Sequence, residues 1–100
     1  METNKSVTVQ VETVGQAYLE VLRARGIKYF FGNSGTDFGP IIDALARFGA
    51  EKKIHPMPIT VPHEFVAVSM AQGYAMITGE PQVVMVHVIV GTGNASAAIM

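Results

Sequence analysis

The stretch MPITVPHEFVAVSMAQGYAMITGEP, residues 57–81, predicts the folding pattern of the whole chain. Prolines in and beside its first part exclude a helix and favour an extended segment over residues 54–61. The apolar, proline-free residues that follow predict a helix from His63 to Thr78, which ends at Gly79. An extended segment that leads directly into a helix is the repeating unit of a parallel α/β sheet.

Two similar units are predicted on the N-terminal side. The segment ETVGQAYLEVLRARG indicates an amphipathic helix with a Thr13/Gln16 capping box, ended by Gly26. The segment from Ile27 to Phe31 reads as a buried strand, GNSGTD as a glycine loop, and the following residues as a second helix. The apolar faces of these helices are predicted to be Val14, Ala17, Tyr18, Val21 and Leu22, and Phe38, Ile41, Ile42, Leu45 and Phe48.

The last part of the chain gives the strongest strand signal. QVVMVHVIV, residues 82–90, is apolar on both faces, which favours a central parallel strand. The residues GTGN are then predicted as a loop, and ASAAIM as the start of a helix with Asn94 as its N-cap. The predicted fold class is therefore α/β, a parallel sheet flanked by helices. Because this last helix has room for under two turns, we expect the front part of a longer polypeptide, or a chain that folds only against partners.

Residues 1–11 are predicted to form an N-terminal arm, with a short edge strand as an alternative, and residues 12–100 an incomplete domain. The 100 residues are 49% hydrophobic and 15% charged, with a net charge of −1 and no cysteine. The net charge gives no electrostatic basis for binding nucleic acid or an anionic membrane. The absence of cysteine excludes a disulfide framework. No apolar run approaches the roughly 20 residues needed to span a bilayer. We expect a soluble, cytoplasmic protein.

Three places combine polar groups with strand ends: GNSGTD, Glu64 and GTGN. The carboxyl ends of parallel strands are where α/β sheets bind ligands, so these groups are predicted to converge. For Glu64 one interpretation is a first-turn carboxylate favoured by the helix dipole. The other is a carboxyl group whose pKa is raised by apolar neighbours, so that its neutral form donates a hydrogen bond to a ring nitrogen.

His87 is predicted within the last strand, four residues before Gly91. It is either a core histidine or a side chain that reaches a cavity above the strand end. GTGNAS also matches part of a dinucleotide-binding fingerprint, with Ser96 in the third glycine position.

Taken together, the motifs resemble the N-terminal, pyrimidine-binding domain of thiamine diphosphate-dependent enzymes of the acetolactate synthase, benzoylformate decarboxylase and pyruvate oxidase superfamily. The resemblance runs from about Val14 to the end of the chain. HE followed by AQGYAMITGEP looks like the family's His-Glu, Gly-Tyr-Ala and Thr-Gly-x-Pro motifs, FFGNSGT resembles its glycine loop, and HVIVGTGNA is similar to a benzoylformate decarboxylase segment. Ser34, Phe65 and Met76 depart from residues common in the family.

The resemblance implies a role for each site residue. Glu64 would hydrogen-bond the aminopyrimidine of the cofactor and drive it to the imino tautomer, whose nitrogen deprotonates the thiazolium carbon to give the ylid that attacks a 2-oxo acid. Gly35, Gly91 and Asn94 would bind the cofactor. Thr36 and His87 would face the substrate, and His87 would also be a catalytic proton-transfer group.

The resemblance further implies a decarboxylase or carboligase that is a lyase or transferase on 2-oxo acids. Magnesium and the diphosphate would be held by a later domain, and FAD is possible but unsupported. The site would form between subunits of a homodimer or homotetramer, so these 100 residues alone would be inactive. Two alternatives stay open: a nicotinamide- or flavin-binding α/β oxidoreductase, resting on GTGNAS alone, and a non-catalytic module that keeps the fold.

Overall fold

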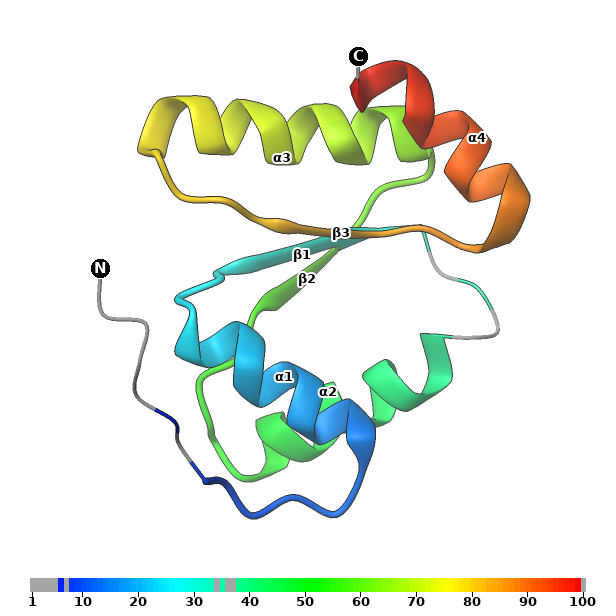
Figure 1. Cartoon of the computed structure of the whole chain (residues 1–100). Coiled ribbons are helices and arrows are strands. Elements are labelled where there is room, and N and C mark those ends of the chain that lie inside the picture. The colour runs from blue at the N-terminus through cyan, green and yellow to red at the C-terminus, as the bar shows by residue number, and fades with distance from the viewer. Residues whose placement is uncertain (1–5, 7, 34, 36–37, 100) are drawn as a thin grey trace.

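The computed structural model describes residue 6, residues 8–33, residue 35 and residues 38–99. In these ranges a parallel sheet lies between two helical layers, with α1 and α2 on one face and α3 and α4 on the other (Figure 1). The predicted α/β fold with a parallel sheet flanked by helices is confirmed. The elements are α1 (Val14–Ala24), β1 (Tyr29–Gly32), α2 (Gly39–Ala50), β2 (Met57–Thr60), α3 (Glu64–Thr78), β3 (Val83–Met85) and α4 (Val88–Ile99).

The sheet has the order β2-β1-β3, with β1 parallel to both neighbours. Phe31 is level with Ile59 on one side and with Val84 on the other. Within the described residues β3 is thus an edge strand, and its predicted central position is wrong. The described residues of the N-terminal arm, 6 and 8–11, form no strand, so the alternative of an edge strand is wrong for them.

The predicted strand over residues 82–90 is also too long. In a parallel pair a strand is stabilised only as far as its partner continues, and β1 ends at Gly32, which is level with Met85. Beyond Met85 the chain turns, Val88 adopts a positive φ of 48°, and α4 begins there. The predicted GTGN loop therefore lies inside α4, and Asn94 is a helical residue and not an N-cap.

The start and end signals of the first helix are confirmed, but its predicted buried face is only partly right: Leu22 is buried, while Val14, Tyr18 and Val21 are exposed. Thr13 Oγ1 accepts from the Gln16 N–H at 3.2 Å, and Gln16 Oε1 accepts from the Thr13 N–H at 3.2 Å, while Gly26 has a φ of 75°. Leu19 and Leu22 are buried, whereas the side chain of Val14 is 86% exposed. The reason is Gly15: a Cβ there would lie 2.6 Å from the Pro40 carbonyl oxygen, so α1 approaches α2 through its glycine face.

Two apolar clusters fill the space on either side of the sheet, and β1 supplies both. Its side chains alternate, with Phe30 in the cluster under α1 and α2, and Phe31 in the cluster under α3. Of the predicted apolar face of α2, Ile41 and Phe48 are buried as expected, while Ile42 is exposed. None of the helices in the described ranges has both the length and the apolar character needed to cross a membrane.

Candidate functional site

Glu64 is the first residue of α3, at the carboxyl end of the parallel sheet, and only 6% of it is exposed. Its position follows from the local sequence. Pro62 ends the extended segment, and His63 caps the helix, with its Nδ1 accepting from the Phe65 N–H at 3.1 Å. A carboxylate in the first turn of a helix is also favoured by the helix dipole. The predicted burial of this carboxyl group is confirmed.

The carboxylate of Glu64 has polar partners on the side that faces the protein. Asn94 donates from Nδ2 to Glu64 Oε1 at 3.1 Å, so α4 and α3 are joined at this point. This hydrogen bond lowers the pKa of the carboxyl group below its ordinary value, and so does the hydrogen bond from the N–H of Glu64 itself. Burial acts in the opposite direction and raises the pKa. Hydrogen bonding by Asn33 and the charge of His63 lower the pKa further.

The predicted raised pKa of Glu64 is therefore wrong for this structure. The sequence argument placed apolar side chains around the carboxylate, but Phe65 and Val66 are 44% and 46% exposed and point away from the buried site. Amide donors from two other segments lie against the carboxylate in their place. Sequence neighbours on a helix diverge by about 100° per residue, so they are poor guides to what surrounds a side chain.

Gly91 allows α4 to approach Glu64 closely. A Cβ at this position would lie 3.3 Å from Glu64 Oε2 and 3.2 Å from the Cβ of Val86, tighter than most side-chain contacts. Asn94 follows one turn later on the same face of α4, since residues three apart are neighbours on a helix. One helix face thus brings a glycine to one oxygen of the carboxylate and an amide to the other.

His87 lies at the junction of β3 and α4 and is not inside a strand, which corrects its predicted placement. Its carbonyl oxygen accepts from the Gly91 N–H at 3.0 Å. A Cβ on Gly35 would overlap the imidazole ring of His87, so the loop after β1 packs directly against this ring. Thr36 lies outside the described residues.

One residue of this region was missed in the sequence. Asn33 directly follows β1, and its Nδ2 donates to the Pro62 carbonyl oxygen at 3.0 Å. Its amide also contributes to holding the carboxylate of Glu64 in the ionised form. An amide side chain immediately after a buried strand, inside a glycine loop, was the signal that could have identified it.

The fold thus gathers the described candidates at one end of the sheet. Gly91 and Asn94 contact Glu64, and Gly35 contacts His87. None of the ion pairs among the described residues includes Glu64, and its charge is stabilised chiefly by amides, with a smaller contribution from His63. A buried carboxylate held in this way can accept a hydrogen bond from a ligand and share its proton. A buried carboxylate of this kind fits the nitrogen-rich aminopyrimidine of thiamine diphosphate.

Other chemistry has less support here. Gly91 and Gly93 lie within α4 and not in a strand-to-helix turn, which is where a dinucleotide fingerprint must bend around a pyrophosphate. In the part of the chain that the structure describes, no three His, Asp or Glu side chains gather in a way that could hold a metal ion.

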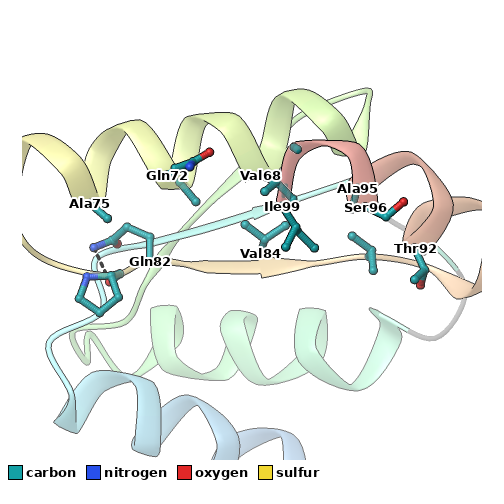
Figure 2. Close-up of a pocket in the computed structure, with 13 residues that line it drawn as sticks. Val68, Gln72, Ala75, Gln82, Val84, Thr92, Ala95, Ser96 and Ile99 are labelled. Carbon is teal, nitrogen blue, oxygen red and sulfur yellow. Dashed lines mark hydrogen bonds between the residues drawn. The ribbon is translucent and has the colours of Figure 1, made fainter.

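An apolar cavity among the described residues is distinct from this site. It has a volume of about 540 Å³ and lies between α3, β3 and α4, where Val68, Val84, Ala95 and Ile99 give it an apolar wall (Figure 2). Neither Glu64 nor His87 lines it. An apolar surface without ionisable groups offers no acid–base chemistry, so we place the candidate site at Glu64 and not in this cavity.

The lowered pKa of Glu64 predicts how stability depends on pH. A carboxyl group whose pKa is lower in the folded state stabilises the fold above its unfolded pKa of about 4.3, and this contribution is lost as the pH falls through the folded value. The difference in thermal midpoint between the protein and its Glu64→Gln variant should therefore shrink as the pH is lowered from 6 to 3. A difference that grows on acidification would show that the pKa is raised.

The comparisons with known proteins agree with the geometry. Residues 12–100 match the family described as thiamine pyrophosphate enzyme, N-terminal TPP binding domain. Benzoylformate decarboxylase of Pseudomonas aeruginosa is 35% identical over 89 residues, which are 89% of this chain and 16% of that protein. The large subunit of acetolactate synthase from Haemophilus influenzae is 37% identical over 82 residues, 82% of this chain and 13% of the subunit.

A third relative, sulfoacetaldehyde acetyltransferase of Castellaniella defragrans, is 33% identical over 91 residues, 91% of this chain and 14% of the transferase. The chain thus spans about one sixth or less of the length of these relatives. The predicted superfamily is confirmed by the match to the family and by the shared identity over most of the chain. The chain belongs to the family of N-terminal TPP-binding domains of thiamine pyrophosphate enzymes.

Proposed function

We propose that this chain forms the pyrimidine-binding part of a thiamine diphosphate-dependent decarboxylase or carboligase that acts on 2-oxo acids. The observation that carries the proposal is Glu64, a buried carboxylate at the carboxyl end of a parallel sheet, held by the amide of Asn94 and included in none of the ion pairs among the described residues. A module that merely kept the fold would have no use for a buried carboxylate, which costs desolvation free energy.

Each described residue has a role in this proposal. Glu64 accepts a hydrogen bond from the aminopyrimidine and shares a proton with it, while Asn94 fixes the orientation of the carboxylate through Oε1. Gly91 leaves room beside Oε2, and Gly35 keeps the loop after β1 close to the imidazole of His87. When bound, thiamine diphosphate supplies the nucleophilic carbon and accepts the electron pair released from the 2-oxo acid.

His87 is the second proposed catalytic residue. Its place between β3 and α4, against the glycine loop, puts the imidazole near the end of the sheet where Glu64 lies. An imidazole is a common general acid and base in enzymes, so this side chain can give and take a proton at the substrate. Thr36, in the same loop, is proposed as a substrate contact. The relative named benzoylformate decarboxylase supports decarboxylation of a 2-oxo acid as one form of the reaction.

The remaining parts of the proposal concern the complete protein. We assign the diphosphate and its Mg²⁺ to a region outside these 100 residues. The relatives support this assignment, because they are several times longer than this chain. The site would lie between the subunits of a cytoplasmic homodimer or homotetramer. FAD is not part of the proposal.

The complete protein, purified without added cofactors, tests the assignment directly. It would be denatured, and the released small molecules would be identified by mass. We expect thiamine diphosphate, since a buried carboxylate poised for the aminopyrimidine retains it. If the protein is purified empty, thiamine diphosphate is titrated in with magnesium and saturable binding is expected. A bound nicotinamide or flavin without thiamine, or no binding in the titration, would overturn the proposal.

A further inference from the structure

We infer that Asn33 is a positioning residue that fixes the carboxylate of Glu64 relative to the end of β1. The inference rests on the proposed role of Glu64, because it assigns to Asn33 the task of orienting that group. Three observations in the structure support it: the hydrogen bonds between the end of β1 and the segment before Glu64, the partners of the Asn33 amide, and the contacts of the loop that Asn33 begins.

The first observation is that hydrogen bonds join the end of β1 to the segment just before Glu64. The N–H of Val61 donates to the Gly32 carbonyl oxygen at 2.9 Å, which continues the parallel ladder to the end of β1. Asn33 Nδ2 donates to the Pro62 carbonyl oxygen at 3.0 Å. A side chain thus adds a further connection, to the backbone two residues before Glu64.

The second observation is that this amide acts at the start of α3, beside Glu64. The carbonyl group of Pro62 lies two residues before Glu64, so holding it restricts the direction in which α3 starts. Hydrogen bonding by Asn33 also favours the ionised carboxylate, as does the bond from Asn94 to Oε1. Two amides, one following β1 and one on α4, therefore restrain the same carboxylate. Of the titratable groups nearby, His63 also acts on it.

The third observation is that Asn33 begins the loop that reaches the other half of the site. Two residues later, Gly35 packs against the imidazole of His87 so closely that a Cβ would overlap the ring. The loop thus contacts the Glu64 side at Asn33 and the His87 side at Gly35. Loss of the Asn33 amide should disturb Glu64 first, because the contact of Gly35 with His87 does not depend on that amide.

The chain offers a matched control at the opposite end of the sheet. Gln82 Oε1 accepts from the N–H groups of Lys28 at 3.1 Å and Tyr29 at 2.8 Å, just before β3 and at the start of β1. Gln82→Ala thus removes the same kind of amide-to-backbone connection between strands. It lies far along the chain from Glu64 and makes no described contact with it. Any effect that both variants share is structural, and any effect that only Asn33 variants show concerns the site.

The experiment compares Asn33→Ala, Asn33→Leu and Gln82→Ala in the complete protein. The ionisation of Glu64 is followed in the apoprotein by infrared difference spectroscopy against Glu64→Gln, and turnover of a 2-oxo acid is measured across pH with thiamine diphosphate and magnesium. Both Asn33 variants should titrate Glu64 at higher pH than the unmodified protein. Their kcat should fall roughly 10- to 100-fold, with KM for the 2-oxo acid little changed. Gln82→Ala should lower the thermal midpoint only.

Identical titration of Glu64 and identical pH profiles in Asn33→Ala and the unmodified protein would overturn the inference. If the alanine variant does not fold, Asn33→Leu, which keeps the size of the side chain without the donor and without an added charge, decides by the same readouts. The proposed function fails separately: if Glu64→Gln keeps full turnover, the role of Glu64 itself is wrong. If Glu64→Gln is inactive while both Asn33 variants behave like Gln82→Ala, only the assignment of Asn33 is wrong.

Discussion

Replacing Glu64 by glutamine in the complete protein is expected to lower turnover of the proposed 2-oxo acid substrate by about 10²- to 10⁴-fold, with the fold retained. Glutamine keeps the shape of the side chain and can still accept from Asn94 Nδ2, so α3 and α4 stay joined. It cannot share a proton with the aminopyrimidine. The measurement is kcat with saturating thiamine diphosphate and magnesium, together with the far-ultraviolet circular dichroism spectrum.

Glu20 provides the matched control for Glu64. It is also a buried carboxylate on a helix, 8% exposed, but it lies on α1 and is paired with Arg23 at 3.1 Å and with Lys53 at 3.4 Å. Glu20→Gln should weaken these ion pairs and lower the thermal midpoint while leaving kcat within about twofold, since no proton transfer passes through it. Unchanged turnover in Glu64→Gln, or an equal loss in both variants, would refute the assignment of Glu64.

Replacing Gly35 by alanine is expected to produce the second large effect. The added Cβ would overlap the imidazole of His87, so either the loop after β1 or the β3–α4 junction must move. Overpacking of this kind costs about 1–3 kcal/mol, which corresponds to hydrogen exchange that is roughly 5- to 150-fold faster in the affected region. Exchange followed by mass spectrometry should show the increase in peptides covering residues 31–40 and 83–92.

Gly49→Ala is the corresponding control. This glycine lies near the end of α2, and a Cβ there would have no neighbour within 4 Å. Alanine should therefore stabilise the helix by about 0.5–1 kcal/mol and slow exchange in α2. If Gly35→Ala also left exchange unchanged around His87, the close packing of the loop against that ring would be disproved.

Much of this protein could be predicted from the sequence alone. Local signals determine where α1 and α3 start and stop, because the Thr13/Gln16 capping box, Gly26 and Gly79 act within a few residues. The parallel α/β class follows from the alternation of extended and helical segments. Glu64 could be singled out because a carboxylate between two apolar segments is rarely accidental, and the surrounding motifs are specific enough to indicate the family.

What the sequence could not determine depends on contacts between distant segments. The buried face of α1 was decided by Gly15 against Pro40, and the length of β3 by the end of its partner β1. The apolar residues 88–90 are strand formers by propensity, but without a neighbouring strand they join α4.

The electrostatic state of Glu64 is the clearest case. Its sequence neighbours predicted an apolar environment and a raised pKa, whereas amides from residues 31 positions before it and 30 positions after it lower that pKa. Hydrogen bonds act over about 3 Å, and only the tertiary structure brings Asn94 within that range of the carboxylate and places Asn33 where it also acts on it. The sequence by itself thus singled out Glu64 as the group proposed to carry the chemistry, and the tertiary structure decided its partners and its charge.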